Sequence, residues 1–207
     1  FNCAGIPGTA DQRVVATVNF VGMRRLTERL VPRMPAGSAI CCVGSTAAVN
    51  WAYHAAALLD LMAIDDDHAA IDWLEAHLPE LGYPYDVSKE AVNAYAAWRA
   101  IGLNPLGIRI NCINPGGTFT PSSREFSKAV RSKEGGTEMI EHWPTLLGRM
   151  ARPAEQAWPM VFLNSPFASF TNGACIFVDA GLTSGMFTAQ HHPKVAAGMF
   201  WSPPAPS

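Results

Sequence analysis

The stretch Ala39-Ile40-Cys41-Cys42-Val43-Gly44-Ser45 indicates the fold class. It is a short apolar run with β-branched side chains that ends at a glycine, as expected of a strand that is buried on both faces. Such strands belong to parallel sheets, because helices cover both sides of a parallel sheet. Ile108–Ile113 is a second run of this kind and Ala174–Val178 is a third, and a glycine-containing turn follows each of them.

Helices are predicted between these strands. Residues 11–34 have apolar side chains spaced three and four positions apart, which is typical of one helix face. Residues 85–101 show the same spacing with Gly102 as the stop, and Pro153 starts a further helix. The alternation of strands and helices predicts an α/β fold with a doubly wound parallel sheet. The apolar face expected on the first helix consists of Val14, Val18, Val21, Leu30 and Met34.

Residues 53–80 interrupt this alternation with two consecutive helices. The acidic run Asp65-Asp66-Asp67 separates them and stands where the N-cap of the second helix belongs. We interpret this run as a solvated helix start rather than as a metal site. The alternative to a packed segment is a mobile surface excursion. The apolar residues expected to pack on the body of the protein or on a neighbouring subunit are Leu58, Leu59, Leu61, Met62, Ile71, Trp73 and Leu74.

One domain is expected over residues 1–189 of the 207-residue chain, followed by a tail over residues 190–207. The polar segment 121–150 is predicted to be flexible, with short helices. The tail has no periodicity, and although His191 and His192 could bind a metal, a plain tail is the simpler interpretation. The sequence opens with what looks like the end of a strand, so we expect further residues to precede it in the natural protein.

The charge balance narrows the class of partner. A net charge of −2 gives the chain no field that would attract nucleic acid or an acidic membrane surface. The sequence shows no signal peptide and no uninterrupted apolar run long enough to span a membrane. All three apolar runs contain cysteine and no C-x-x-C pair occurs, which indicates buried thiols and a reducing cytoplasm. We therefore expect a small molecule or a second copy of the chain as the partner.

Three polar side chains suggest the chemistry. Tyr85 and Lys89 are four positions apart on a predicted helix and therefore share a face. An ammonium group beside a phenol stabilises the phenolate, so Lys89 is expected to lower the pKa of Tyr85. Ser45 follows a strand, and ligands of open α/β sheets bind at the carboxyl ends of strands. This trio suits proton transfer at an alcohol oxygen while a cofactor transfers a hydride.

The order of these motifs resembles that of the short-chain dehydrogenase/reductase family. Tyr85-Asp86-Val87-Ser88-Lys89 matches the family's Tyr-x-x-x-Lys signature, and Ser45 stands in the place of its catalytic serine. Asn19 falls where the family keeps a helix asparagine that anchors a water in a proton relay. Asn2-Cys3-Ala4-Gly5 and the stretch 114–121 resemble two of its cofactor-contacting turns. The resemblance covers about residues 1–186 and includes the later stretches Arg152-Pro153-Ala154-Glu155 and Asp179-Ala180-Gly181.

The resemblance implies a Rossmann-like fold, an oxidoreductase activity and specific roles for these residues. The implied catalytic residues are Asn19, Ser45, Tyr85 and Lys89. The implied cofactor-binding residues are Asn2, Ala4, Gly5, Tyr85, Lys89, Pro115, Gly116, Thr118 and Thr120. The implied cofactor is NAD, with NADP not excluded, and no metal is expected.

Two departures from the family pattern matter. Ser45 and Tyr85 are 40 positions apart, whereas most family members have a much shorter segment between them. The two-helix stretch accounts for the difference and resembles the helical insert of the bacterial 3α-hydroxysteroid dehydrogenase/carbonyl reductase branch, which coniferyl-alcohol dehydrogenases share. The family's glycine-rich phosphate-binding turn, which lies in the first strand–helix unit, is absent from this sequence. The predicted sheet therefore lacks its first strands.

The expected function is NAD(P)-dependent interconversion of a secondary or aromatic alcohol and its carbonyl, of the hydroxysteroid or carbonyl reductase type. The alternatives are a coniferyl-alcohol-type dehydrogenase, a related epimerase or dehydratase, and a non-catalytic subunit or scaffold. A homodimer or homotetramer is expected. The side chains expected to line the substrate pocket, or equally to form ordinary core, are Phe119, Phe126, Met139 and Trp143.

Overall fold

A computed structural model describes residues 1–132 and 147–188 of the chain. The described residues form a parallel sheet of three strands in the order β1-β2-β3, with β1 at Ala39–Val43, β2 at Arg109–Pro115 and β3 at Cys175–Val178. All three predicted strands are therefore confirmed. The expected tail and two of the predicted pocket residues, Met139 and Trp143, lie outside the described residues.

Asn2 extends the sheet beyond β1. Its backbone N–H donates to Cys41 O at 2.9 Å, and its carbonyl accepts from Val43 N at 3.2 Å. This parallel bridge places the segment 2–5 beside the carboxyl end of β1, as the strand-end pattern of these residues predicts. The first residues of the chain thus border the same edge of the sheet as Ser45.

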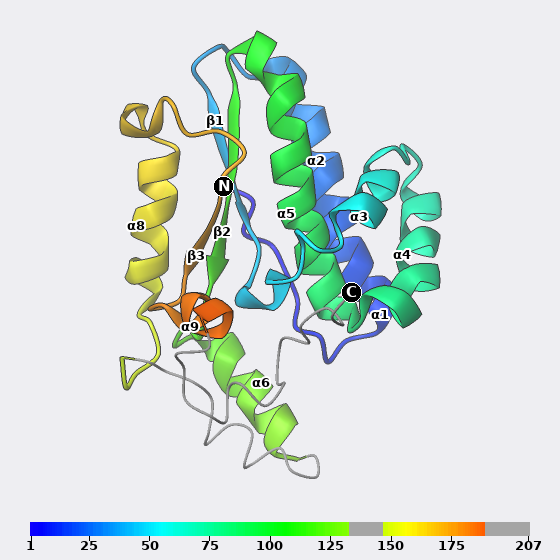
Figure 1. Cartoon of the computed structure of the whole chain (residues 1–207), viewed down its shortest axis with the longest axis vertical. Coiled ribbons are helices and arrows are strands. Elements are labelled where there is room, and N and C mark those ends of the chain that lie inside the picture. The colour runs from blue at the N-terminus through cyan, green and yellow to red at the C-terminus, as the bar shows by residue number, and fades with distance from the viewer. Residues whose placement is uncertain (133–146, 189–207) are drawn as a thin grey trace.

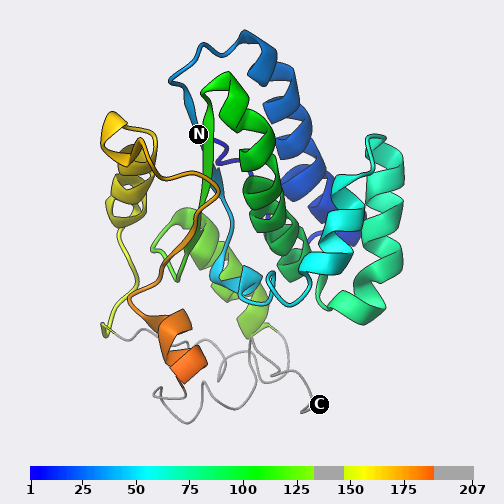
Figure 2. The ribbon, with the colours of Figure 1, turned by 45° about the horizontal axis from the view of Figure 1, so that its top comes forward.

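Helices cover both faces of the sheet, as the fold class requires (Figures 1 and 2). The helices α2 (Gly22–Leu30) and α5 (Pro84–Leu103) lie on one side, and α8 (Pro153–Leu163) lies on the other. Neighbouring residues of β1 serve the two layers, because Cys42 belongs to the larger hydrophobic core and Cys41 packs with Met160 and Leu163 of α8. Two further helices follow the strands: α6 (Pro121–Arg131) comes after β2, and α9 (Leu182–Thr188) comes after β3.

The first predicted helix is continuous but buries a different face from the one expected. It runs through α1 (Gln12–Ala16), a π-helical turn at Thr17–Val21, α2 and a short 3₁₀ turn at Val31–Arg33. Val21 of the expected face is buried, but Val14 and Leu30 are 48% and 44% exposed, so the expected face matches the buried one only in part. The buried face includes hydrogen-bonded polar residues such as Asn19 and Thr27, and a pattern of apolar residues alone could not identify it.

The two-helix insert is confirmed as α3 (Ala55–Met62) and α4 (Asp67–Leu81). Asp66 caps α4 by accepting a hydrogen bond from Ala69 N at 2.8 Å, as predicted for the acidic run. Of the apolar residues expected to be covered, Leu59 is half exposed and Trp73 is partly buried. The insert packs on the body of the protein through the buried side chains of Leu58, Leu61, Met62, Ile71 and Leu74.

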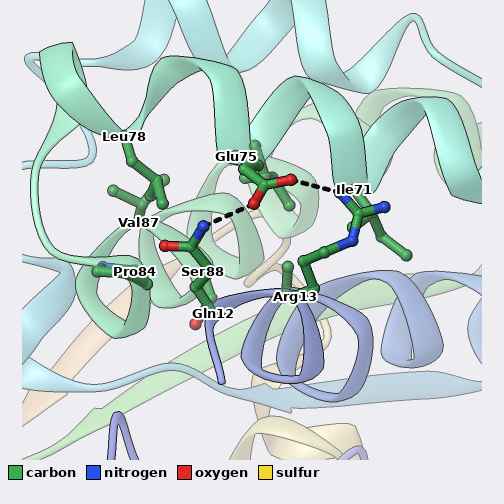
Figure 3. Close-up of a pocket in the computed structure, with 10 residues that line it drawn as sticks. Gln12, Arg13, Ile71, Glu75, Leu78, Pro84, Val87 and Ser88 are labelled. Carbon is green, nitrogen blue, oxygen red and sulfur yellow. Dashed lines mark hydrogen bonds and ion pairs between the residues drawn. The ribbon is translucent and has the colours of Figure 1, made fainter. Parts of the chain in front are cut away.

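Polar contacts hold the insert against α1 (Figure 3). Gln12 Nε2 donates to Glu75 Oε1 at 2.6 Å, and Arg13 pairs with both Glu75 and Asp72. Figure 3 shows Gln12, Arg13 and Glu75 beside a pocket of only about 10 Å³, which is roughly the space for one water molecule. The insert therefore leaves no room for a ligand along this seam.

The helix α5 passes Gly102, the predicted stop, and ends at Leu103 before a 3₁₀ turn at Asn104–Leu106. The left-handed residue that terminates this segment is Gly107, with a φ of 66°. Trp98 and Ile101 share the helical spacing of the buried residues but are exposed. The amino-terminal half of α5, which carries the Tyr-x-x-x-Lys motif, is its most deeply buried part.

Candidate active site

Ser45 stands at the carboxyl end of β1, where the sequence placed it. Its backbone N–H donates to Asn114 Oδ1 at 3.0 Å, and its hydroxyl accepts from Ala47 N at 3.1 Å. A Cβ on Gly44 would come within 2.1 Å of Asn114 Oδ1, so glycine is required beside Ser45. Asn114 thus positions Ser45, a role that the sequence reasoning missed because it treated Asn114 only as part of a turn motif.

Tyr85 and Lys89 share one face of α5, as predicted, and this face is turned toward the end of β1. Lys89 Nζ lies 5.7 Å from the centroid of the Tyr85 ring and donates to Val43 O at 3.1 Å. The Ser45 side chain lies close enough to the Tyr85 phenol to lower the pKa of that phenol. The structure therefore brings Ser45, Tyr85 and Lys89 together although 40 positions separate the first two.

The prediction that Lys89 lowers the pKa of Tyr85 was wrong for the protein alone. Burial raises the pKa of Tyr85, the Ser45 side chain lowers it, and the charge of Asp86 raises it further. Burial also lowers the pKa of Lys89, because its ammonium group loses water. The ammonium group lies beside the ring and bonds to a carbonyl, so it does not solvate the phenolate oxygen in this state.

Asn19 lies in the π-helical turn and faces the first loop of the chain. Its Oδ1 accepts from Ile6 N at 2.8 Å, while its Nδ2 donates to Ile6 O at 3.1 Å and to Ser88 Oγ at 3.2 Å. Ser88 in turn donates to Tyr85 O at 2.7 Å. Asn19 is thus connected to α5 through Ser88, a contact that was not predicted, and π-helical turns often occur at functional sites.

The turn at residues 2–5 adjoins the same cluster. A Cβ on Gly5 would lie 3.3 Å from Asn19 Oδ1 and 3.4 Å from Lys89 Nζ, so the glycine keeps the space beside the ammonium group open. Ala4 is exposed nearby, whereas the Asn2 side chain turns inward and donates to Thr27 Oγ1 at 2.8 Å. The glycine cradle and the ammonium group together fit one end of an extended polar ligand.

The predicted cofactor turn after β2 is held by its own contacts. A Cβ on Gly116 would lie 2.9 Å from Asp179, so packing against the end of β3 already requires this glycine. Thr118 Oγ1 donates to Gly116 O at 2.9 Å, and Thr120 Oγ1 accepts from Ser123 N at the start of α6. Pro115 is the last residue of β2 and so brings this turn to the sheet edge that carries Ser45.

Of the residues expected to line the substrate pocket, Phe119 is 57% exposed and stacks with the guanidinium group of Arg124. The side chain of Phe126 lies outside the described part of the structure. Among residues 1–132 and 147–188, no group of His, Cys, Asp and Glu side chains could hold a metal ion. None of the helices described is long and apolar enough to cross a membrane.

Comparison with known proteins identifies similar dehydrogenases and reductases. The family model described as Enoyl-(Acyl carrier protein) reductase matches residues 70–183. The chain is 32% identical over 189 residues to the coniferyl-alcohol dehydrogenase of Pseudomonas sp. (strain HR199 / DSM 7063). This match covers 88% of this chain and 70% of the relative. It is 30% identical over 193 residues to the 3-alpha-hydroxysteroid dehydrogenase/carbonyl reductase of Comamonas testosteroni, with 91% and 73% covered.

A solved structure confirms the fold. The 3-alpha-hydroxysteroid dehydrogenase of Pseudomonas sp. B-0831, crystallised as a complex with NADH, superposes with a TM-score of 0.74 at 29% sequence identity. The match covers 92% of this chain and 74% of that one, and it confirms the Rossmann-like architecture. On the fold, the motifs and these similarities, the chain belongs to the short-chain dehydrogenase/reductase family of oxidoreductases that act on alcohols and carbonyls.

Proposed function

We propose that the protein is an NAD(P)-dependent enzyme that interconverts a secondary or aromatic alcohol and its carbonyl. The observation that carries this proposal is the joint placement of Ser45, Tyr85 and Lys89 at the carboxyl end of β1. The names of the similar proteins, which include coniferyl-alcohol, hydroxysteroid and cyclopentanol dehydrogenases, favour an aryl, alicyclic or steroid alcohol.

The residues beside Lys89 fit the nicotinamide half of a dinucleotide. The Lys89 ammonium group has three donors, and the glycine at position 5 leaves room next to it for ribose hydroxyls. We propose that Asn2, Ala4, Gly5, Tyr85 and Lys89 border this half on one side, and that Pro115, Gly116, Thr118 and Thr120 border it on the other. The bound cofactor would accept or supply the hydride, and NAD is the expected form because a similar protein was crystallised with NADH.

The chain's own residues handle the proton. Ser45 and Tyr85 would hydrogen-bond the substrate oxygen, since Ser45 follows β1 and its side chain acts on the pKa of the Tyr85 phenol. In carbonyl reduction, the raised pKa of Tyr85 keeps the phenol protonated and ready to donate its proton to the forming alcohol. In alcohol oxidation, the same phenol must first lose its proton, and a positive charge near its oxygen would assist that loss.

Asn19 would connect this proton to solvent. Its side chain is fully engaged by Ile6 and Ser88, so it can hold the first loop and α5 in a fixed relation without itself titrating. We propose that a water beside Asn19 and Lys89 restores the proton that Tyr85 donates. This role requires the two residues to remain close, as the short distances from the Cβ position of Gly5 to both indicate.

A substrate and cofactor screen tests the proposed function. Steroids, quinones and aryl alcohols, each offered with NAD(H) and with NADP(H), should reveal turnover as a change in absorbance of the reduced nicotinamide. Nicotinamide fluorescence should show binding of the reduced cofactor without substrate. Binding of the cofactor without turnover of any ketone or alcohol would contradict the proposal.

We also propose that the protein is a homodimer or homotetramer in the cytoplasm. An exposed aromatic face on α8 and the following turn favours self-association, and its members are Trp158, Phe162, Phe167 and Phe170. The cysteines bear on the proposed location. Burial raises the pKa of the Cys42 thiol to about 11 and that of the Cys41 thiol to about 12, so both thiols stay protonated and unreactive, as expected in a reducing cytoplasm. Light scattering would test the oligomer, because a monomeric mass at micromolar concentration would overturn it.

A further inference from the structure

A buried carboxylate follows the catalytic lysine directly. Glu90 is the residue after Lys89 in α5, and its side chain is only 2% exposed. Its Oε2 lies 2.6 Å from His54 Nδ1, and the His54 side chain is 24% exposed. A carboxylate at this depth needs a partner, because an unpaired buried charge is strongly destabilising.

His54 ends the segment that starts at Ser45. Successive backbone hydrogen bonds run along this segment from Ser45 O, which accepts from Ala48 N, to Asn50 O, which accepts from His54 N at 3.2 Å. The carbonyl of His54 then accepts from Leu58 N and starts α3. The segment is therefore a chain of tight turns that transmits the position of His54 to Ser45.

The segment is anchored at both ends. Asn114 Oδ1 holds the backbone N–H of Ser45 at 3.0 Å, and Glu90 holds the ring of His54 at the other end. The first anchor belongs to β2 and the second to α5, the helix that carries Tyr85 and Lys89. The relation between Ser45 and Tyr85 thus depends on a contact that is made next to Lys89.

Stability alone is a poor explanation for this pair. Replacing a buried ionic pair by apolar side chains of similar volume is often neutral or stabilising, so burial of Glu90 does not itself strengthen the fold. A second carboxylate, Asp86, lies one turn earlier on α5 and interacts with Glu90 through its charge. Among the groups whose charge acts on Glu90, His54 is the one that favours its ionised form.

We infer that His54 and Glu90 are a positioning pair, which holds the Ser45 segment against α5 so that Ser45 and Tyr85 bond the same substrate oxygen. This inference rests on the proposed function. Neither residue touches substrate or cofactor in this role. The pair acts on the geometry between the serine and the tyrosine, so its loss should reduce kcat more than it raises the KM of the cofactor.

Three variants test the inference in the intact protein. His54→Ala should lower kcat by about tenfold or more, with little change in the KM of the cofactor, because small misplacements of reacting groups slow the chemical step. His54→Asn should restore most of kcat, because the Asn amide nitrogen occupies the place of the imidazole Nδ1. Glu90→Gln keeps a polar group of the same shape and should give an intermediate loss without an unpaired charge.

His77→Ala is the matched control. His77 also lies in the insert, and its Nδ1 also makes one hydrogen bond, to Trp73 O at 2.7 Å, but it has no contact with Glu90. This variant should keep kcat even if its melting temperature falls. If His54→Ala and His77→Ala lower kcat equally, or if His54→Asn does not restore kcat, the positioning role is refuted.

The activity of the wild-type protein distinguishes a failure of the proposed function from a failure of the positioning pair. Absence of turnover by the wild type would overturn the proposed function itself. Turnover by the wild type that survives unchanged in His54→Ala would overturn only the positioning pair. If His54→Ala does not fold, the other two variants provide the test, since both retain a hydrogen-bonding partner. We expect His54→Asn to keep most of kcat and Glu90→Gln to lose part of it, and an unchanged kcat in Glu90→Gln would refute the positioning role.

Discussion

The two flanks of α5 hold the catalytic face in different ways. On one flank, Ser88 meets Asn19, and the contact joins a hydroxyl and an amide that carry no charge at any ordinary pH. On the other flank, Glu90 meets His54 with Asp86 nearby, and burial raises the pKa of both Glu90 and Asp86. Tyr85 therefore lies between two sets of contacts: one is independent of pH, and the other depends on pH.

The largest effect is expected at the residue between the flanks. Tyr85→Phe removes the hydroxyl that transfers the proton, so kcat should fall by about 100-fold or more. The affinity for reduced nicotinamide should stay nearly unchanged, because Lys89 and Gly5 remain. Rates at substrate saturation and a fluorescence titration check the two parts, and retention of most of the activity would show that another group transfers the proton.

The uncharged flank should be the next most sensitive. Asn19→Ala leaves both backbone groups of Ile6 without their partner, which costs about 1–3 kcal/mol of stability for buried groups. It should also lower kcat by about tenfold or more at every pH, since no titrating group is lost. Ser88→Ala is the matched control, because it removes one contact of Asn19 and keeps the pair with Ile6. A loss of kcat that varies with pH would break the proposed contrast between the flanks.

The charged flank should give a pH-dependent result. Burial and the charge of Glu90 raise the pKa of Asp86 from 3.8 to about 7, so the folded protein holds this proton more tightly than the unfolded chain. The contribution of Asp86 to stability is therefore lost as the pH rises through that window, by up to about 4 kcal/mol. Asp86→Asn should be more stable relative to the wild type at pH 8 than at pH 4, as thermal unfolding at both values would show.

The same variant should change catalysis in a defined direction. The charge of Asp86 raises the pKa of Tyr85, so Asp86→Asn should shift the rise of alcohol oxidation with pH toward lower pH. The pH profile of kcat/KM measures this shift. An unchanged profile would mean that Asp86 does not act on the phenol.

The smallest effect is expected far from both flanks. Arg13 pairs with Asp72 and Glu75 at the exposed rim of the insert, and exposed ion pairs contribute little. Arg13→Ala should lower the melting temperature by no more than about 2 °C and leave kcat unchanged. A large loss of kcat would show that the attachment of α4 to α1 also controls the catalytic face.

The strands, the insert and the shared helix face of Tyr85 and Lys89 could be predicted from the sequence because each depends on local patterns. The apolar run before Gly44 forms the strand β1, and Tyr85 and Lys89, four positions apart, lie on the helix α5. The buried face of the first helix could not be predicted, because Asn19 and Thr27 are buried through hydrogen bonds. The raised pKa of Tyr85 could not be predicted either, because burial depends on residues that are distant in the sequence.

The supporting contacts of the site were the hardest to foresee. Asn114 meets Ser45 across 69 positions and His54 meets Glu90 across 36, and no periodicity links such pairs. A charged residue beside Lys89 in a buried stretch was the one available signal for Glu90. Asn93 is a second polar residue in this buried stretch. It is fully buried next to Gly44, and neither polar atom of its side chain has a hydrogen-bond partner in the structure.

The π-helical turn at Thr17–Val21 determines where Asn19 lies in the first helix. Gly22 N bonds to Thr17 O, five residues back, so the turn holds one residue more than a regular helix would. Deleting a single residue there would restore ordinary winding, because the turn already absorbs one extra residue, and the helix on either side would keep its rotation. Such a deletion would instead change the widened turn itself, which holds Asn19 against Ile6 and Ser88.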